Sequence, residues 1–257
     1  MDQKNLKRSI RALFIAIAFS SSHSAFADEA PAPITAVLVH GAFADGSSWH
    51  KVIPELHDAG LNVISVQNPL SSLEDDVATT LRAIDSAEGS VVLVGHSWGG
   101  IVITEAGMHD KVQSLVYISS YAPSVGESLL DIAGLYETPE SFGSLLADQD
   151  GYLRLPQEAM QKYFAHDVAQ DEVAIMASVQ GRINSAALVE PVSLAAWQYK
   201  PTWFVVSEED QIAPVDMQEA LVEKIEATPI RIPSSHVPMV SFPQDVAAAI
   251  LSAAQLQ

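Results

Sequence analysis

The chain has 257 residues, 48% hydrophobic and 18% charged, a composition that predicts one sizeable globular domain and excludes a disordered chain. It carries 13 Lys and Arg against 32 Asp and Glu, and this formal net charge of −19 argues against nucleic acid and anionic membrane surfaces as partners. Because there is no cysteine, disulfides, a thiol nucleophile and thiolate metal ligands are excluded. The eight histidines show no metal-binding spacing, so we expect no metal site.

The first 27 residues have the pattern of a secretory signal peptide. Four Lys and Arg between positions 4 and 11 precede an apolar run that ends in Ala25-Phe26-Ala27, a small-residue cleavage site. The strongly apolar part, residues 12–19, is far shorter than the roughly 20 residues that a membrane-spanning helix needs. We therefore expect cleavage after Ala27 and a periplasmic or secreted mature chain, residues 28–257, without membrane insertion. That chain keeps 9 Lys and Arg against 31 Asp and Glu, a formal net charge of −22.

Short apolar runs alternate with helical patterns along much of the mature chain. Buried strands are predicted at residues 34–39, 61–66, 91–94, 112–119, 202–207 and 228–233. Helices are predicted at residues 48–59, 71–86, from 98 onward, at 215–227 and at 243–254, and a Ser71-x-x-Glu74 capping box opens the second of them. This alternation predicts an α/β fold with a mostly parallel sheet and helices on both of its faces.

The alternation stops between about residues 122 and 198. This stretch contains amphipathic segments such as ESFGSLLAD, PQEAMQKYFAHDV and QDEVAIMASVQ, and no convincing strand. We therefore predict a small helical lid, inserted late in the chain over the ends of the strands. Gln180 and Arg182, in VQGRIN, are expected to brace this lid, with substrate contact as the alternative role.

The stretch VVLVGHSWGGIVITEA, residues 91–106, places a serine between a buried strand and a helix. Its Gly95-His96-Ser97-Trp98-Gly99 matches Gly-x-Ser-x-Gly, in which glycines permit close backbone passage and the serine hydroxyl is presented on a strained turn. A serine that merely caps the helix is the alternative interpretation. The strand before it and the helix after it favour Ser97 as a nucleophile.

A serine hydroxyl needs a base, which in turn needs an orienting acid, and in this architecture the chain order is Ser, then Asp or Glu, then His. Three histidines follow Ser97: His109 in the helix of the nucleophile, His166 in the insertion, and His236 after the last strand. We predict His236 as the base, because the ends of the strands converge at its position.

The predicted acid lies in SEEDQIAP, the loop after the strand at residues 202–207. This loop offers Glu208, Glu209 and Asp210, and three adjacent acids ordinarily indicate a solvated turn. We assign the role to Asp210, which lies deepest in the loop before Pro214. Its carboxylate would fix the tautomer of the histidine and stabilise the imidazolium.

An oxyanion that forms during attack on a carbonyl needs two preorganised N–H donors. The backbone N–H of Trp98 is one candidate, and we assign the second to Ala42, in the loop that follows the first strand. His40, at the start of this loop, is interpreted as a brace and not as a catalytic residue. Apolar residues expected to line a substrate pocket, although core packing explains them equally well, are Phe43, Tyr121, Leu135 and Met239.

With these motifs the chain resembles the α/β-hydrolase superfamily, and more closely its small-esterase branch, which includes salicylate and methyl-ester esterases, pyrethroid-hydrolase-like enzymes and plant hydroxynitrile lyases. The resemblance covers nearly all of residues 34–254, through VLVHGAFADGSSW, VVLVGHSWGGIVITEAG, AAWQYKPTWFVVSEEDQIAP and SSHVPMVSFPQDVA. It implies the α/β-hydrolase fold and a cofactor-free serine hydrolase. By motif position it also implies a triad and two oxyanion donors at Ser97, Asp210, His236, Ala42 and Trp98.

Two positions depart from the lyase members of this branch. The plant hydroxynitrile lyases carry a threonine after the histidine of the first loop and a lysine after the catalytic histidine. Gly41 and Val237 occupy those positions here. The resemblance therefore favours ester hydrolysis over lyase chemistry.

The sequence predicts a carboxylic-ester hydrolase that acts through an acyl-enzyme on small, neutral, fairly hydrophobic esters, as a monomer or a homodimer. Two alternatives stay open because a fold does not determine a function. One is lactone or amide hydrolysis on the same scaffold. The other is a non-turnover ligand-binding protein that keeps the hydrolase fold and the triad.

Overall fold

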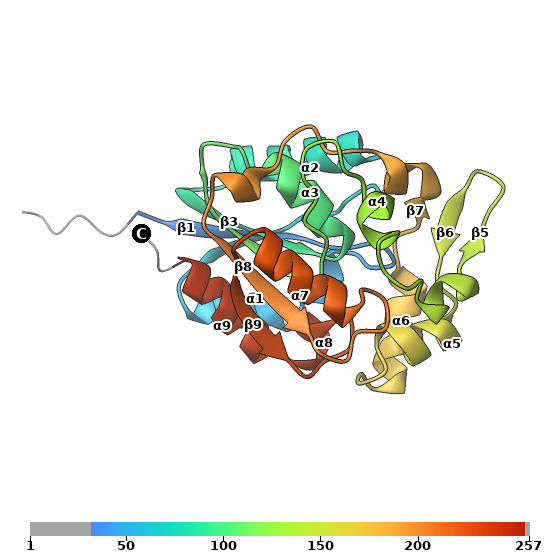
Figure 1. Ribbon diagram of the computed structural model, residues 1–257. Helices are drawn as coiled ribbons and strands as arrows, with labels where there is room; N and C mark the ends of the chain where they lie inside the picture. Colours follow the sequence, from blue (N-terminus) through green and yellow to red (C-terminus); the bar gives the residue numbers. More distant parts are fainter. Residues whose placement is uncertain (1–31, 255–257) are drawn as a thin grey trace, which may run out of the picture. The chain divides into compact units, whose positions relative to one another are not determined.

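The computed structural model describes residues 32–254. The predicted signal peptide and its cleavage site lie outside the described residues. Within them, six strands form one parallel sheet in the order β2-β1-β3-β4-β8-β9 (Figure 1). These strands are β1 (Ile34–Val39), β2 (Asn62–Ser65), β3 (Ser90–His96), β4 (Val112–Ile118), β8 (Thr202–Ser207) and β9 (Thr228–Ile232). The prediction of a mostly parallel sheet is confirmed.

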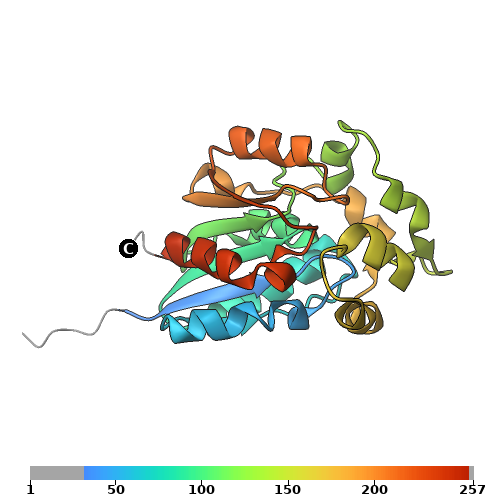
Figure 2. The same cartoon turned by 90° about the horizontal axis from the view of Figure 1, so that it is seen from below.

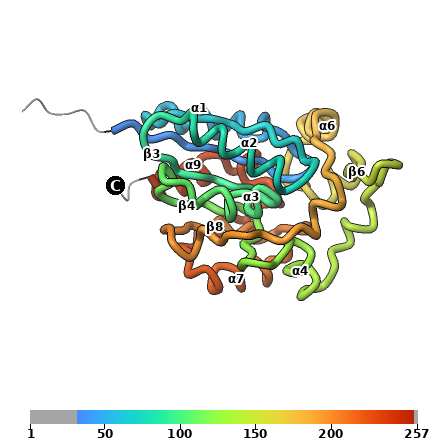
Figure 3. Tube along the Cα trace, turned by 90° about the horizontal axis from the view of Figure 1, so that it is seen from above, coloured from blue at the N-terminus to red at the C-terminus, as the bar shows by residue number. Residues whose placement is uncertain are grey.

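Helices cover both faces of the sheet. On one face lie α1 (Val52–Asp58) and α9 (Pro243–Ala254), seen in front of the strands in Figure 2. The other face packs against α2 (Leu73–Ser86), α3 (Trp98–Ala106) and α7 (Val215–Lys224), which are traced in Figure 3. Successive strand residues point to opposite faces, so Leu93 packs toward α3 while its neighbour Val94 packs toward α9. Both faces are therefore buried, which explains the nearly unbroken apolar strands.

Two helix starts differ from the prediction. The Ser71-x-x-Glu74 capping box is wrong by one residue, because α2 is capped by Ser72, whose Oγ accepts from the backbone N–H of Asp75. The hydroxyl of Ser71 donates to the Asp75 carboxylate instead. The helix predicted at residues 48–59 is divided into a short 3-10 turn, η1 (Gly46–Trp49), and α1.

Residues 129–189 of the segment between β4 and β8 form a cap that lies at one end of the sheet in all three views (Figure 1). The prediction of a purely helical lid is wrong, because the cap contains a three-stranded antiparallel sheet. These strands have two or three residues each, too short for alternation to be visible in the sequence, and Gly151, at φ +83°, turns the chain between the first two. The cap elements are α4 (Leu129–Ala133), η2 (Glu140–Ser144), β5 (Leu146–Ala147), β6 (Tyr152–Arg154), α5 (Gln157–Ala159), η3 (Met160–Phe164), α6 (Gln170–Val179), β7 (Ile183–Asn184) and η4 (Ser185–Val189), whereas η5 (Ala196–Gln198) packs beside α3.

Cap segments are tied together by Gln180. Its side-chain Oε1 accepts from Leu155 N–H and its Nε2 donates to the carbonyl of the same residue, both at 2.9 Å. The expected bracing role of Gln180 is confirmed by these contacts. The side chain of Arg182 forms an exposed ion pair of 3.7 Å with Asp148. No helix within residues 32–254 has the length and apolar character needed to span a bilayer.

The packing of β3 leads to a stability prediction. Leu93 is fully buried in the middle of the sheet, so Leu93→Ala should lower the free energy of unfolding by about 2–5 kcal/mol through lost transfer energy and the cavity that remains. Leu135→Ala, at a side chain that is 78% exposed, should change it by less than about 0.5 kcal/mol. Urea denaturation of both variants measures the difference, and equal effects would contradict this view of the core.

Candidate active site

Ser97 lies at the turn between β3 and α3, in a backbone conformation that few residues adopt. Its φ of 51° and ψ of −119° are strained for a residue with a side chain. Flanking glycines make the turn possible: a Cβ on Gly95 would lie 2.5 Å from the Gly99 carbonyl oxygen, and one on Gly99 2.4 Å from that of Val39. The strained strand-to-helix turn predicted from Gly-x-Ser-x-Gly is therefore present.

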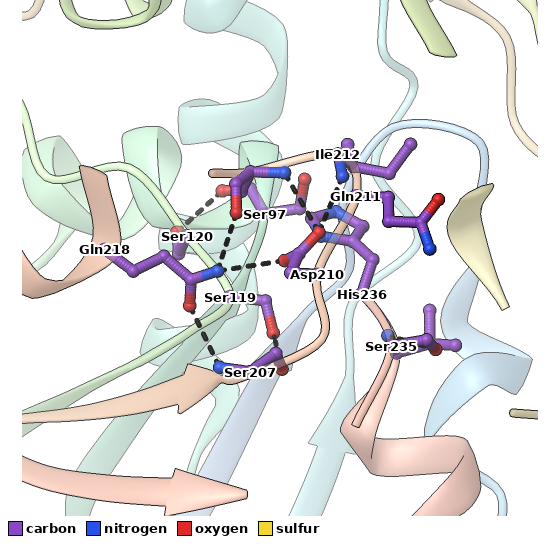
Figure 4. Close-up of polar contacts among 12 residues, drawn as sticks. Ser97, Ser119, Ser120, Ser207, Asp210, Gln211, Ile212, Gln218, Ser235 and His236 are labelled. Atoms are coloured by element: carbon purple, nitrogen blue, oxygen red, sulfur yellow. Dashed lines mark hydrogen bonds and ion pairs between the residues drawn. The ribbon is translucent and has the colours of Figure 1, made fainter. Parts of the chain in front are cut away.

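Asp210 and His236 meet at the carboxyl edge of the sheet, on the loops after β8 and β9. The Nδ1 of His236 lies 2.7 Å from the Oδ2 of Asp210, and both side chains are fully buried (Figure 4). Since a carboxylate only accepts, Nδ1 donates the proton and Nε2 carries the lone pair. Glu208 and Glu209 are exposed, so Asp210 is the acid of its loop that reaches the histidine.

The Nε2 atom of His236 is buried and has no hydrogen-bond partner in the described part of the chain. An unpartnered basic nitrogen at this place is what a general base requires. Ser97 and His236 are not hydrogen-bonded to each other within residues 32–254. Such contacts are often long in unliganded enzymes and tighten when substrate binds.

Asp210 is held as an acceptor by three further donors. Its Oδ1 accepts from the backbone N–H groups of Ile212 and Ala213 at 2.8 and 3.0 Å. Its Oδ2 accepts from the side-chain Nε2 of Gln218 at 3.0 Å, beside the bond from His236 (Figure 4). Gln218, in α7, also accepts from Ser207 N–H and donates to the Ala213 carbonyl. The sequence analysis missed Gln218, because no local motif marks a helical glutamine that faces an acid eight residues earlier.

The ring of His236 is packed between residues from two parts of the chain. The Nε2–H of His96 donates to the His236 carbonyl oxygen at 2.8 Å, and the two imidazole centroids are 4.8 Å apart. Burial lowers the pKa of His96 well below its ordinary value, so His96 stays neutral and adds no positive charge beside His236. On the other side Phe164 of the cap packs edge-on at 5.0 Å between centroids. The cap thus helps to exclude water from His236.

The loop after β1 presents the second predicted N–H donor. Neither Ala42 N–H nor Trp98 N–H donates to another group among the described residues, so both are free to bind an oxyanion. His40 braces this loop, as predicted: its Nδ1–H donates to the Gly41 carbonyl and its Nε2 accepts from the backbone N–H of Asn68. Burial lowers the pKa of His40, which keeps the ring neutral for both contacts.

Ser97 opens into a mostly apolar cavity of about 60 Å³, called here the Ser97 cavity. Predicted pocket residues Phe43 and Tyr121 line it, with Ala42 and Trp98. Burial, with Asp210 nearby, raises the pKa of Tyr121, so its hydroxyl keeps its proton. The remaining lining residues are Leu129, Ser141, Phe142, Leu145, Leu153, Leu155, Ile183, Leu188 and Ile212.

The prediction that Leu135 and Met239 line the substrate pocket is wrong. Leu135 follows the end of α4 at Ala133, and its side chain is 78% exposed to solvent. Met239 lies in α8 (Pro238–Ser241), and its fully buried side chain packs into the core on the α9 side of the sheet. Neither residue lines the Ser97 cavity.

A buried carboxylate supports the wall of this cavity. The indole Nε1 of Trp98 donates to Asp76 Oδ2 at 2.7 Å, and the backbone N–H of Leu70 donates to Asp76 Oδ1 at 2.8 Å. Burial, with Asp75 and Glu190 nearby, raises the pKa of Asp76 to about 6 despite these two donors. The sequence analysis gave Asp76 no role, because in LEDDV it resembles an ordinary acid in the first turn of a helix.

Across the part of the chain that the structure describes, no group of three or more His, Asp or Glu side chains is arranged to hold a metal ion.

Comparison with known proteins identifies the class. A model described as the alpha/beta hydrolase family matches residues 36–249. Methylesterase 7 of Arabidopsis thaliana is 26% identical over 249 residues, covering 85% of this chain and 95% of the relative. The pyrethroid hydrolase of Sphingobium wenxiniae is 23% identical over 242 residues, with coverages of 83% and 85%. The crystal structure of polyneuridine aldehyde esterase is similar with a TM-score of 0.74 and 20% identity, over 87% of this chain and 100% of that one.

The chain belongs to the alpha/beta hydrolase family. Both the predicted fold and the resemblance to the branch that includes methyl-ester esterases and pyrethroid-hydrolase-like enzymes are confirmed. Family membership and relatives named as esterases support hydrolase activity on this scaffold.

The contacts of Gln218 predict a loss of activity when its amide is removed. Gln218→Met keeps the size of the side chain but takes one donor from the Asp210 carboxylate, and a hydrogen bond to a charged group contributes about 1.5–3 kcal/mol. We expect kcat/KM for an ester to fall about ten- to hundred-fold. Gln211→Met, at an exposed side chain of the same loop, is the control. A folded Gln218→Met protein with full activity would show that Asp210 does not depend on this amide.

Asp76 predicts a pH-dependent stability. An acid whose pKa rises from 3.8 to about 6 on folding binds more protons in the native state, so stability falls as pH increases through this window. Asp76→Asn cannot ionise, and its free energy of unfolding relative to the wild type should rise by about 2 kcal/mol between pH 4 and pH 7. Denaturation at the two pH values measures the change, with Asp58→Asn at an exposed site as control. A pH-independent difference would contradict the shifted pKa.

Proposed function

We propose that the protein is a carboxylic-ester hydrolase that forms an acyl-enzyme on Ser97. The observation that carries this proposal is the buried His236–Asp210 pair, whose Nε2 has no partner among the described residues. It lies at the same edge of the sheet as a serine on a strained turn that opens into an apolar cavity. Hydrolase-family membership and esterase-named relatives agree with this reading.

In the first half-reaction, Ser97 Oγ attacks the ester carbonyl carbon while its proton passes to His236 Nε2. The N–H groups of Ala42 and Trp98 stabilise the negative charge that develops on the carbonyl oxygen. The carbon–oxygen bond to the alcohol then breaks, and His236 returns the proton to the departing alkoxide. Asp210 keeps the ring in the required tautomer and stabilises the imidazolium.

In the second half-reaction, a water molecule attacks the acyl carbon and gives one proton to His236. The bond between the acyl group and Ser97 Oγ breaks, and the proton on His236 restores the serine hydroxyl. One ester and one water are thereby converted into one acid and one alcohol. The neutral His96 leaves Asp210 as the charged partner of His236 in both halves.

The proposed substrates are small, neutral and fairly hydrophobic. The Ser97 cavity is lined mainly by aliphatic and aromatic side chains, which favour an uncharged acyl group. The net charge of −19 disfavours anionic substrates and assists release of a carboxylate product. A methylesterase and a pyrethroid hydrolase among the relatives support an ester substrate.

Substitution of Ser97 tests the proposed function. Ser97→Ala should lower kcat for p-nitrophenyl acetate by about four to six orders of magnitude and abolish the burst of p-nitrophenol that marks acyl-enzyme formation. Ser178→Ala, at an exposed serine in α6, should keep wild-type kinetics. Equal activity of the wild type and Ser97→Ala would contradict the proposal. A wild type that is inert on esters but opens lactones would move the assignment to lactone hydrolysis.

A further inference from the structure

A second cavity, of about 230 Å³, lies beside the Ser97 cavity. Its apolar walls come from three parts of the chain, and we call it the α6 groove. The residues that form these walls are Phe43 from the loop after β1, Ile175, Met176 and Val179 from α6, and Val237 and Val240 from the segment after His236.

The two cavities meet at Phe43, which lines both of them. Its backbone is held in a left-handed conformation, φ 59°, by a pair of hydrogen bonds to the cap. Phe43 N–H donates to the Gly181 carbonyl, and Gly181 N–H donates to the Ala44 carbonyl, both at 3.1 Å. A Cβ on Gly181 would lie 2.6 Å from Leu70 Cδ1 and 3.0 Å from the Ala44 oxygen, so a larger residue there would have to displace the Leu70 side chain. The main chain of this shared residue is therefore held by the cap.

The size of the Ser97 cavity limits what it can hold. Pockets that bury small-molecule ligands usually measure about 300–1,000 Å³, whereas this cavity has about 60 Å³. A short acyl group fits such a space, but a complete hydrophobic ester does not. The remainder of a larger substrate must therefore lie outside it.

The chemistry of the leaving group indicates on which side that remainder lies. The departing alcohol oxygen takes its proton from His236, so the alcohol portion leaves on the histidine side. Val237 and Val240, which follow His236 in the chain, line the α6 groove, whereas no residue of this segment lines the Ser97 cavity. Ala42 and Trp98, whose N–H groups are assigned to the carbonyl oxygen, line the Ser97 cavity and not the groove.

We propose that the α6 groove binds the alcohol portion of the ester, a bulky uncharged apolar group, while the Ser97 cavity holds a short acyl group. This assignment rests on the proposed esterase function. The carboxylates at the groove already have partners within the protein: Glu172 is ion-paired with Lys51 at 2.8 Å, and Asp45 accepts from Ser47 N–H. They therefore leave no unpartnered carboxylate for a ligand to bind, which favours an uncharged alcohol. Ile175 and Val179, 64% and 43% exposed, offer apolar surface that such a group would cover.

A pair of isomeric esters tests the assignment. Naphthylmethyl acetate carries its ring system on the alcohol, and methyl naphthylacetate carries it on the acid; both have alkyl leaving groups and the same atoms. We expect kcat/KM of the wild type to favour naphthylmethyl acetate by about tenfold or more. Ile175→Asp should reduce this preference at least about fivefold, because a charge in the groove opposes burial of the ring.

Val125→Asp is the matched control. Like Ile175, Val125 has a β-branched aliphatic side chain that is largely exposed (58%), but it does not line the groove. It should leave the preference between the isomers unchanged. If the wild type hydrolyses ethyl acetate but does not favour naphthylmethyl acetate over methyl naphthylacetate, the assignment is overturned and the esterase function remains. The same holds if Ile175→Asp leaves the preference for naphthylmethyl acetate unchanged. Absence of turnover on ethyl acetate and both isomers would overturn the esterase function and this assignment together.

Discussion

The close approach of three backbone segments around Ser97 is the constraint on which the candidate site depends. A Cβ on Gly41 would lie 2.7 Å from the Cβ of Ser97, and a Cβ on Gly99 2.4 Å from the oxygen of Val39. The loop after β1, the end of β3 and the start of α3 are thus in direct backbone contact. This contact keeps Ser97 in a strained conformation that costs about 1–3 kcal/mol by itself. Ala42 and Trp98, whose N–H groups donate to no other group among the described residues, line the same cavity as Ser97.

The parallel sheet brings the other two members of the predicted triad to the same edge. Because β3, β8 and β9 are parallel, the loops after them all open at their carboxyl ends. Placing His236 at this edge of the sheet does not by itself orient its imidazole ring, however, since the ring can rotate. The Asp210 carboxylate, itself held by four donors, and the edge-on ring of Phe164 fix the orientation of His236. One of these supports comes from the hydrolase core and the other from the cap.

What the sequence could predict follows from how local the signals are. The strand at residues 34–39 and the helix at residues 243–254 have continuous apolar patterns, and the structure has them at the same bounds. The Asp210–His236 contact followed from chain order and strand topology. Gln218 and Asp76 act through tertiary contacts with no local pattern, so the sequence did not reveal them. Leu135 and Met239 failed because an apolar residue in an amphipathic segment can equally face solvent, core or cavity.

The cap contacts the candidate site at two places, the loop after β1 and the ring of His236. Gly181 accepts from Phe43 N–H, one residue after Ala42, and donates to the Ala44 carbonyl, and Phe164 contacts the ring of His236. Asn184 N–H also donates to the carbonyl of Leu70, whose own N–H is held by Asp76 beneath Trp98. A displacement of the cap therefore alters the loop that carries one proposed oxyanion donor, the surroundings of the proposed base and the support of Trp98 together. In this molecule, access to the serine and the geometry of the chemistry are not separable properties, because the same cap residues determine both.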